Sequence, residues 1–197
     1  RALEHGLMAA STVAERLELH ASRVVVLLNS LRVEEATAQA RLLAHELQSN
    51  SDALPAERVA AALFACVAVA PHTSELQRLA ELCETLRSRC ESGPPQAQQS
   101  FHLSLGTCLN WWGRPISAEA DLNEARMLAD GFGDFGAVVN VTHQQLRNAL
   151  LLGRTANALA AAEDCHHAVR TGGYGSSFLL HAWAAKVLVG VAAGRPE

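Results

Sequence analysis

The sequence predicts an all-helical fold built from repeated hairpins, and three observations lead to this class. Alanine dominates, as in segments 59–63 and 158–162, and it is the strongest helix former but fits strands poorly. Prolines are scarce and fall in the gaps between apolar stretches. The ends of successive helical segments recur at positions 31, 71, 113, 153 and 194, every 40 to 42 residues. Such spacing is typical of a helical repeat array.

Composition narrows the class further. The chain has 197 residues, is 49% hydrophobic and carries a net charge of -4, which excludes intrinsic disorder for most of it. Arginines are scattered among more numerous acids and Lys186 is the only lysine, so we expect no direct binding of nucleic acid. The longest apolar run, 60–71, is about half of what a bilayer requires. We therefore expect neither a transmembrane helix nor a secretory leader.

Helix boundaries follow from periodicity and capping residues. Thr12 with Glu15 forms a capping box, and prolines 55 and 115 suit the first turn of a helix. Thr73 and Thr155 are expected N-caps. The predicted helices are 12–30, 33–48, 55–70, 73–91, 96–112, 115–130, 136–152, 155–171 and 177–193.

Small or apolar residues form three columns in the second helix of each hairpin. They stand five, nine and twelve residues after each turn, on one helix face. Only small side chains permit the close approach that stacked hairpins need. The columns are Ala36, Leu76, Ala118, Ala158; then Ala40, Ala80, Leu122, Ala162; then Leu43, Cys83, Ala125, Cys165.

These positions resemble the tetratricopeptide repeat. Its pattern is matched best in the third repeat, and the fourth keeps its turn glycine and first small residue. The first two repeats carry Leu31 and Pro71 in place of the turn glycine, and the period exceeds the usual 34 residues. The matching residues are Leu105, Gly106, Gly113, Ala118, Leu122 and Ala125, then Gly153 and Ala158.

The resemblance implies a right-handed α-α superhelix of about four and a half hairpins, one domain covering 1–197. Because the chain begins and ends inside repeats, we expect it to be a fragment of a longer protein.

In this family the first helices line a concave groove, which gives the candidate binding residues. An arginine, a tryptophan and several amides and imidazoles on one face favour a peptide or polar ligand. The alternative is that Trp111 and Trp112 pack between repeats and the polar groups are only solvated; Trp183 is expected in the core. Counting back from each turn gives Arg58, Thr107, Asn110, Trp111, Asn140, His143, Arg147 and His181, with Ser100 and Asn29 beside them.

Three motifs with catalytic or ligand associations have simpler structural explanations. Segment 131–136 spells G-x-G-x-x-G but follows a helix rather than a strand, so it indicates a turn and not a dinucleotide site. The run Cys165-His166-His167 cannot converge on one metal, because consecutive helical residues point about 100° apart. Nothing places a cysteine–histidine catalytic pair. We expect no enzyme activity, no metal and no cofactor.

The five cysteines are odd in number, include no Cys-x-x-Cys pair and lie in apolar helical contexts. We expect all five to be free, buried thiols, which favours a cytoplasmic location.

The segment Glu124 to Asp130, followed by a Gly-Asp turn, is similar to the sensor region of large ATP-binding, LuxR-type bacterial transcription regulators that include the maltose activator. The resemblance implies a non-catalytic domain that binds a protein partner or a small effector in its groove. A structural adaptor in a multiprotein assembly, or a repeat region preceding a diguanylate cyclase domain, are the alternatives.

Overall fold

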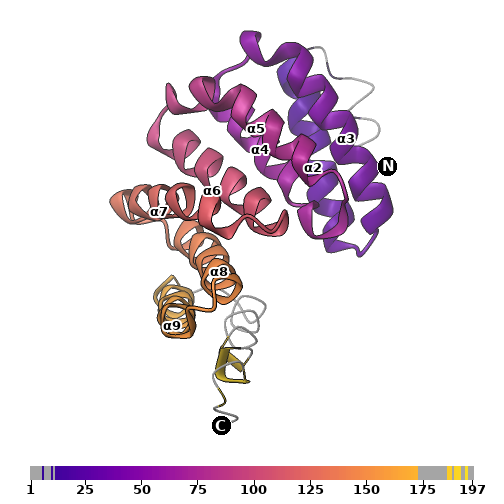
Figure 1. Ribbon diagram of the computed structural model, residues 1–197. Coiled ribbons are helices and arrows are strands. Elements are labelled where there is room, and N and C mark those ends of the chain that lie inside the picture. The colour runs from indigo at the N-terminus through magenta and orange to yellow at the C-terminus, as the bar shows by residue number, and fades with distance from the viewer. Residues whose placement is uncertain are drawn as a thin grey trace.

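The computed structural model describes residues 12–172, together with 6, 10, 186, 187, 189–191 and 194. The described part is all-helical and contains no strand, which confirms the predicted class. Two short 3-10 turns, η1 (Ser51–Ala53) and η2 (Ala70–His72), accompany the helices (Figure 1). The α-helices are α2 (Val13–Asn29), α3 (Val33–Asn50), α4 (Ala56–Val67), α5 (Leu76–Glu91), α6 (Pro95–Trp111), α7 (Pro115–Phe132), α8 (Phe135–Leu151) and α9 (Thr155–Thr171). The predicted helix 177–193 lies mostly outside the described residues.

Consecutive helices pack as hairpins: α2 with α3, α4 with α5, α6 with α7 and α8 with α9. The first helices of the hairpins also touch one another in sequence, since α4 contacts both α2 and α6, and α6 contacts α8. In Figure 1 the chain accordingly progresses from α2 and α3 through α6 to α9 without returning to its start. The first helices, α2, α4, α6 and α8, therefore form a continuous row.

Left-handed residues close three of these hairpins at the predicted turn positions. Leu31, Gly113 and Gly153 have φ values of 57°, 76° and 69°. In each turn the next residue donates its N–H to a carbonyl five residues back, as Arg114 does to Leu109 at 2.8 Å. This is a Schellman ending, which satisfies carbonyls that the helix leaves unpaired.

The second hairpin turns differently, because Pro71 cannot adopt a positive φ. Helix α4 ends at Val67, the chain passes through η2, and α5 begins only at Leu76, so the predicted boundaries 70 and 73 are wrong. Thr73 is not the N-cap of α5; its hydroxyl accepts the N–H of Glu75 at 3.1 Å in the loop before the helix.

The other predicted caps give a mixed result. The capping box of Thr12 and Glu15 is confirmed, and Pro115 occupies the first turn of α7. Pro55 precedes α4 as its N-cap, and Thr155 is the first residue of α9 rather than its N-cap. These differences are shifts of one position and leave the helices in place.

The three predicted columns form the interior of the hairpins. All twelve residues are buried except Leu76, which is half-buried, and Ala118, Ala125 and Ala158 have no exposed surface. Gly106 on α6 lies in close contact with α7 in the third hairpin, since a Cβ there would meet Leu122 Cδ2 at 2.7 Å. Small residues therefore set the separation of the helices, as the pattern predicted.

Two hairpins carry a polar bridge at the same pair of positions, eleven residues before and eight after the turn. In the third hairpin His102 Nδ1 lies 2.9 Å from Asp121 Oδ1. In the first, Gln39 Nε2 hydrogen-bonds to His20 Nδ1. The sequence analysis did not identify this recurrence, although both pairs are separated by 19 residues.

Candidate functional site

A pocket of about 320 Å³ opens where α4, α6 and α8 meet. Its lining on each helix follows helical spacing, such as Thr107 and Trp111 on α6, or Asn140, His143 and Gln144 on α8. Phe64 and Val67 of α4, Leu103 of α6 and Val139 of α8 supply its apolar part. An apolar pocket with a few polar groups at its edge is the usual form of a ligand site.

The pocket brings together four of the predicted groove residues, Thr107, Trp111, Asn140 and His143. They come from two hairpins and are adjacent only because α6 and α8 lie side by side. Asn140 and His143 are exposed, whereas Thr107 and Trp111 are half-buried. Four of the residues predicted by counting back from the turns therefore line the α4/α6/α8 pocket.

Arg147 is not itself a lining residue, but it stacks on Trp111, which lines the pocket. Its guanidinium carbon is 3.3 Å from the centroid of the Trp111 ring, close enough for a cation–π interaction. Burial of the side chain lowers the pKa of Arg147 from its usual value. Its Nε is buried without a hydrogen-bond partner, and within the described residues no carboxylate pairs with this side chain.

Asn110 has a different place from the one predicted. It is 1% exposed, and its Nδ2 donates to the carbonyl of Gln144 at 3.0 Å. Its Oδ1 accepts from Asn148 Nδ2 at 2.9 Å, and the same nitrogen of Asn148 donates to the Pro115 carbonyl. Asn110 thus joins α6 to α8 from inside and positions the pocket walls instead of lining them.

The remaining predicted residues are spread along the chain. Arg58 pairs with Glu18 between α2 and α4, where the two line a neighbouring groove of about 440 Å³. Asn29 is exposed at the end of α2, and Ser100 is half-buried near the start of α6. His181 and Trp183 lie outside the described residues.

Phe64 is the main lining residue that sequence reasoning missed. It is 40% exposed and lines both the α2/α4 groove and the α4/α6/α8 pocket, so the two hollows adjoin at this residue. Seven residues before the turn, the other hairpins have the buried residues Val24, Gly106 and Leu146. The sequence signal for this lining residue was an aromatic side chain at a position where the other hairpins have valine, glycine or leucine.

Trp112, the neighbour of Trp111, has its own arginine. The Arg114 guanidinium carbon lies 3.8 Å from its ring centroid, and neither residue lines the pocket. The two arginine–tryptophan pairs therefore have similar geometry in different surroundings.

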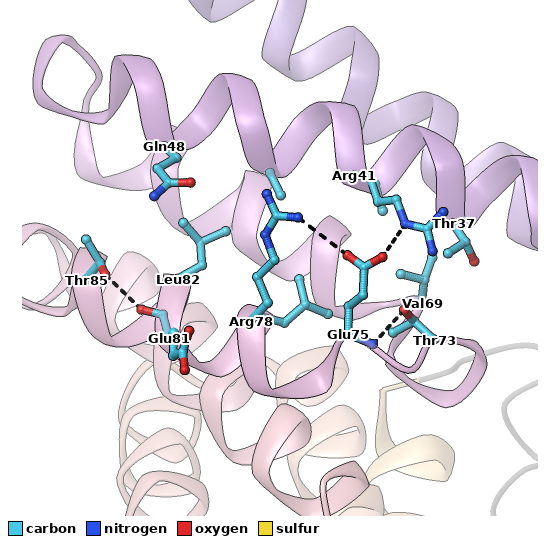
Figure 2. A pocket seen from close by; sticks show the side chains of 13 residues that line it. Thr37, Arg41, Gln48, Val69, Thr73, Glu75, Arg78, Glu81, Leu82 and Thr85 are labelled. Carbon is cyan, nitrogen blue, oxygen red and sulfur yellow. Dashed lines mark hydrogen bonds and ion pairs between the residues drawn. The ribbon is translucent and has the colours of Figure 1, made fainter.

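A second groove, which the sequence did not predict, lies between the second helices α3 and α5 and has a volume of about 350 Å³. Figure 2 shows Glu75 between two arginines, with Oε1 2.6 Å from Arg41 Nε and Oε2 3.9 Å from Arg78 Nη1. Glu81, Gln48 and three threonines, Thr37, Thr73 and Thr85, complete its polar lining. Two arginines and two glutamates line this groove, so its formal charges balance.

The cysteines are all free and buried, as predicted. Burial raises the pKa of Cys66, Cys90 and Cys108 to about 12, and that of Cys83 and Cys165 above its usual value. Such thiols stay protonated near neutral pH, and a protonated thiol is a poor nucleophile. No cluster of three metal-binding side chains occurs among the described residues.

The glycine-rich segment is a helix junction. Gly133 ends α7 with φ 66°, and Asp134 caps α8 by accepting the N–H groups of Gly136 and Ala137 at 2.8 and 3.1 Å. Its resemblance to a phosphate-binding loop is explained by this turn.

No protein-family model matches the chain, and no curated protein or solved structure is significantly similar to it. None of the described helices is long and apolar enough to span a membrane. The function therefore has to be argued from the geometry of the site.

Proposed function

We propose that this chain is a non-catalytic binding domain that holds a protein partner or a small effector on the inner surface formed by α2, α4, α6 and α8. The observation that carries the proposal is the α4/α6/α8 pocket, in which apolar side chains meet exposed polar ones beside a half-buried arginine. Phe64 extends the same surface to the α2/α4 groove. Buried aromatic anchors with arginine nearby are the groups that contribute most to binding energy.

The architecture we propose is a right-handed superhelix of tetratricopeptide-like hairpins. It is supported by the continuous row of first-helix contacts and by the Schellman turns at Leu31, Gly113 and Gly153. In such an array the first helices face the concave side, where the pocket would lie. The resemblance noted above leads us to propose further that the domain serves a bacterial LuxR-type transcription regulator, with a diguanylate cyclase protein as the alternative parent.

The inner surface is tested by selecting peptides from a displayed library on the wild-type chain and measuring their affinities for two variants. Phe64→Glu places a charge at the centre of the inner surface, and we expect selected peptides to lose roughly 30-fold or more in affinity, the usual loss at a binding hot spot. Thr85→Glu is the matched control, since Thr85 is exposed and lines the α3/α5 groove. Selected peptides that bind Phe64→Glu with the affinity of the wild-type chain would contradict the proposal.

A structural adaptor is the second candidate, because the α3/α5 groove gives the molecule another polar surface, which shares no lining residue with the α4/α6/α8 pocket. An adaptor holds two partners at once. Peptide selection would then yield two classes, one lost in Phe64→Glu and the other in Thr85→Glu. A single class, lost only in Phe64→Glu, favours the sensor.

A further inference from the structure

We propose that the α4/α6/α8 pocket takes a small apolar carboxylate, with the carboxylate paired to Arg147 and the apolar part between Phe64 and Val139. The inference rests on the proposed binding function of the inner surface and specifies its ligand class.

The first argument is the missing counter-ion of Arg147. Three other half-buried arginines pair with acids. Arg16 lies 3.0 Å from Glu46, Arg87 lies 2.9 Å from both Glu84 and Glu91, and Arg126 lies 2.9 Å from Asp130 and 3.3 Å from Asp164. Arg147 is also half-buried, but its Nε is buried without any hydrogen bond. A half-buried cation without a counter-ion leaves part of its charge uncompensated, and an anionic ligand would supply the missing charge.

The second argument is that this guanidinium is already held in place. Its carbon lies 3.3 Å from the Trp111 ring centroid, and Trp111 itself lines the pocket. A guanidinium fixed against a ring loses less conformational freedom when it binds. Its planar set of N–H donors matches a carboxylate, which accepts two hydrogen bonds side by side.

The third argument concerns ligand charge. No arginine or lysine is among the described residues that line the pocket, and Arg147 reaches its edge by stacking on Trp111. One guanidinium neutralises a single negative charge, so a monocarboxylate fits better than a doubly charged phosphate ester.

The fourth argument concerns size and polarity. A volume of about 320 Å³ is at the lower end for ligand sites, so the ligand is small. Leu103, Phe64 and Val139 favour an apolar body. Gln144, one helical turn before Arg147, has a buried Oε1 with no donor, so a hydroxyl group on the ligand would be accepted there.

The test is calorimetric titration of the chain with butyrate, octanoate, phenylacetate and their 2-hydroxy derivatives, each compared with its neutral carboxamide. We expect the best carboxylate to bind on the order of 10- to 100-fold more tightly than its carboxamide, the range for a charge-assisted hydrogen bond. Arg147→Gln removes this preference. Arg147→Lys keeps the charge and retains a preference, which covers the case in which the glutamine variant fails to fold.

Arg114→Gln is the matched control, because Arg114 also stacks on a tryptophan, but that tryptophan, Trp112, does not line the pocket. It should leave the carboxylate preference unchanged. In ¹⁵N–¹H spectra the Arg147 Nε resonance should shift with carboxylates and not with carboxamides.

The carboxylate assignment is wrong if a carboxylate and its carboxamide bind equally, or if the preference for the carboxylate survives Arg147→Gln. It is also wrong if phenyl phosphate binds more tightly than the carboxylates, or if no carboxylate binds at millimolar concentration. If the compounds bind without a preference for the carboxylate but Phe64→Ala weakens their binding, the inner surface binds ligands and the proposed function stands. Binding that neither Arg147→Gln nor Phe64→Ala affects places the ligand elsewhere and contradicts both proposals.

Discussion

The second and third hairpins reach similar packing with different residues. At the turn, α6–α7 has Gly113 with φ 76°, whereas α4–α5 has Pro71 within a 3-10 turn. Seven residues earlier, Gly106 lies against the second helix of its own hairpin, whereas Phe64 is exposed on the inner surface. The same position therefore serves close packing in one hairpin and lies on the proposed binding surface in the other.

The interiors differ as well. Where the third hairpin has the His102–Asp121 bridge, the second has Ala60 and Leu79, both buried. The columns of the second helices are nevertheless small or apolar in both. The second helices therefore keep small or apolar residues at equivalent positions in both hairpins, while the first-helix residues at the compared positions differ.

The largest effect is expected when one partner of the His102–Asp121 bridge is removed. Asp121→Ala leaves the buried His102 without its acceptor, and Asp121 also lies 3.6 Å from Arg87. We expect the free energy of unfolding to fall by roughly 1–3 kcal/mol, measured by urea denaturation. The double variant His102→Ala/Asp121→Leu introduces the pair of the second hairpin and should recover most of the loss, because replacing both partners with apolar groups is nearly neutral. A double variant less stable than Asp121→Ala would contradict the equivalence of the two interiors.

A single methyl group at Gly106 tests the close approach of α6 and α7. In Gly106→Ala the new Cβ would lie 2.7 Å from Leu122 Cδ2 and Cγ, so the core must shift. We expect a loss of about 1–3 kcal/mol in unfolding free energy, read from thermal and urea melts.

Gly131→Ala is the control for that substitution, since Gly131 is exposed on α7 and a Cβ there has nothing within 4 Å. It should be neutral or stabilise the chain by about 0.5–1 kcal/mol. Equal losses in the two variants would mean that Gly106 does not set the helix separation.

The helices and their register followed from the sequence because both depend on local patterns. Small residues at fixed intervals after a turn specify a buried face, and eleven of the twelve column residues are buried. The second turn was misplaced because Pro71 fits the end of a helix and a 3-10 turn equally well.

The candidate site was only partly predictable. Helical counting brought Thr107, Trp111, Asn140 and His143 together, since they share one face of two neighbouring helices. It could not separate them from Asn110, because whether an amide meets solvent or Asn148 depends on the next hairpin. Phe64 was missed for the opposite reason, since an apolar residue in an alanine-rich helix is expected to be buried.

A smaller effect distinguishes the turns of the first and third hairpins. Leu31 adopts φ 57° although it has a Cβ, and its side chain is 86% exposed. Leu31→Gly removes the left-handed strain and should stabilise the chain by about 0.5–1 kcal/mol. Gly113→Ala should destabilise it by about 1 kcal/mol. Differential scanning calorimetry of both variants checks the signs, and a loss of stability in Leu31→Gly would show that the exposed leucine contributes contacts.

The smallest effect concerns the pH dependence of the first hairpin's bridge. Burial lowers the pKa of His20 below 6.5, and the nearby Arg16 and Arg23 act in the same direction, against the attraction of Glu46, which lies 3.6 Å from Nε2. Gln39 Nε2 donates to His20 Nδ1, so the neutral ring fits this bond and protonation of Nδ1 removes its acceptor. The unfolded chain therefore binds the His20 proton more tightly than the folded chain. Stability from this residue is present above the unfolded pKa of 6.5 and is lost as pH falls through the folded pKa.

His20→Gln removes this titration while keeping a polar group beside Gln39. Between about pH 7.5 and about pH 5, the wild-type chain should lose more unfolding free energy than the variant, as measured by urea melts at each pH. His45→Gln is a suitable control, because His45 is exposed on α3 and should leave the pH profile of the wild type unchanged. If the wild type instead gains stability relative to His20→Gln as pH falls, the attraction of Glu46 outweighs burial, and protonation of His20 stabilises the first hairpin.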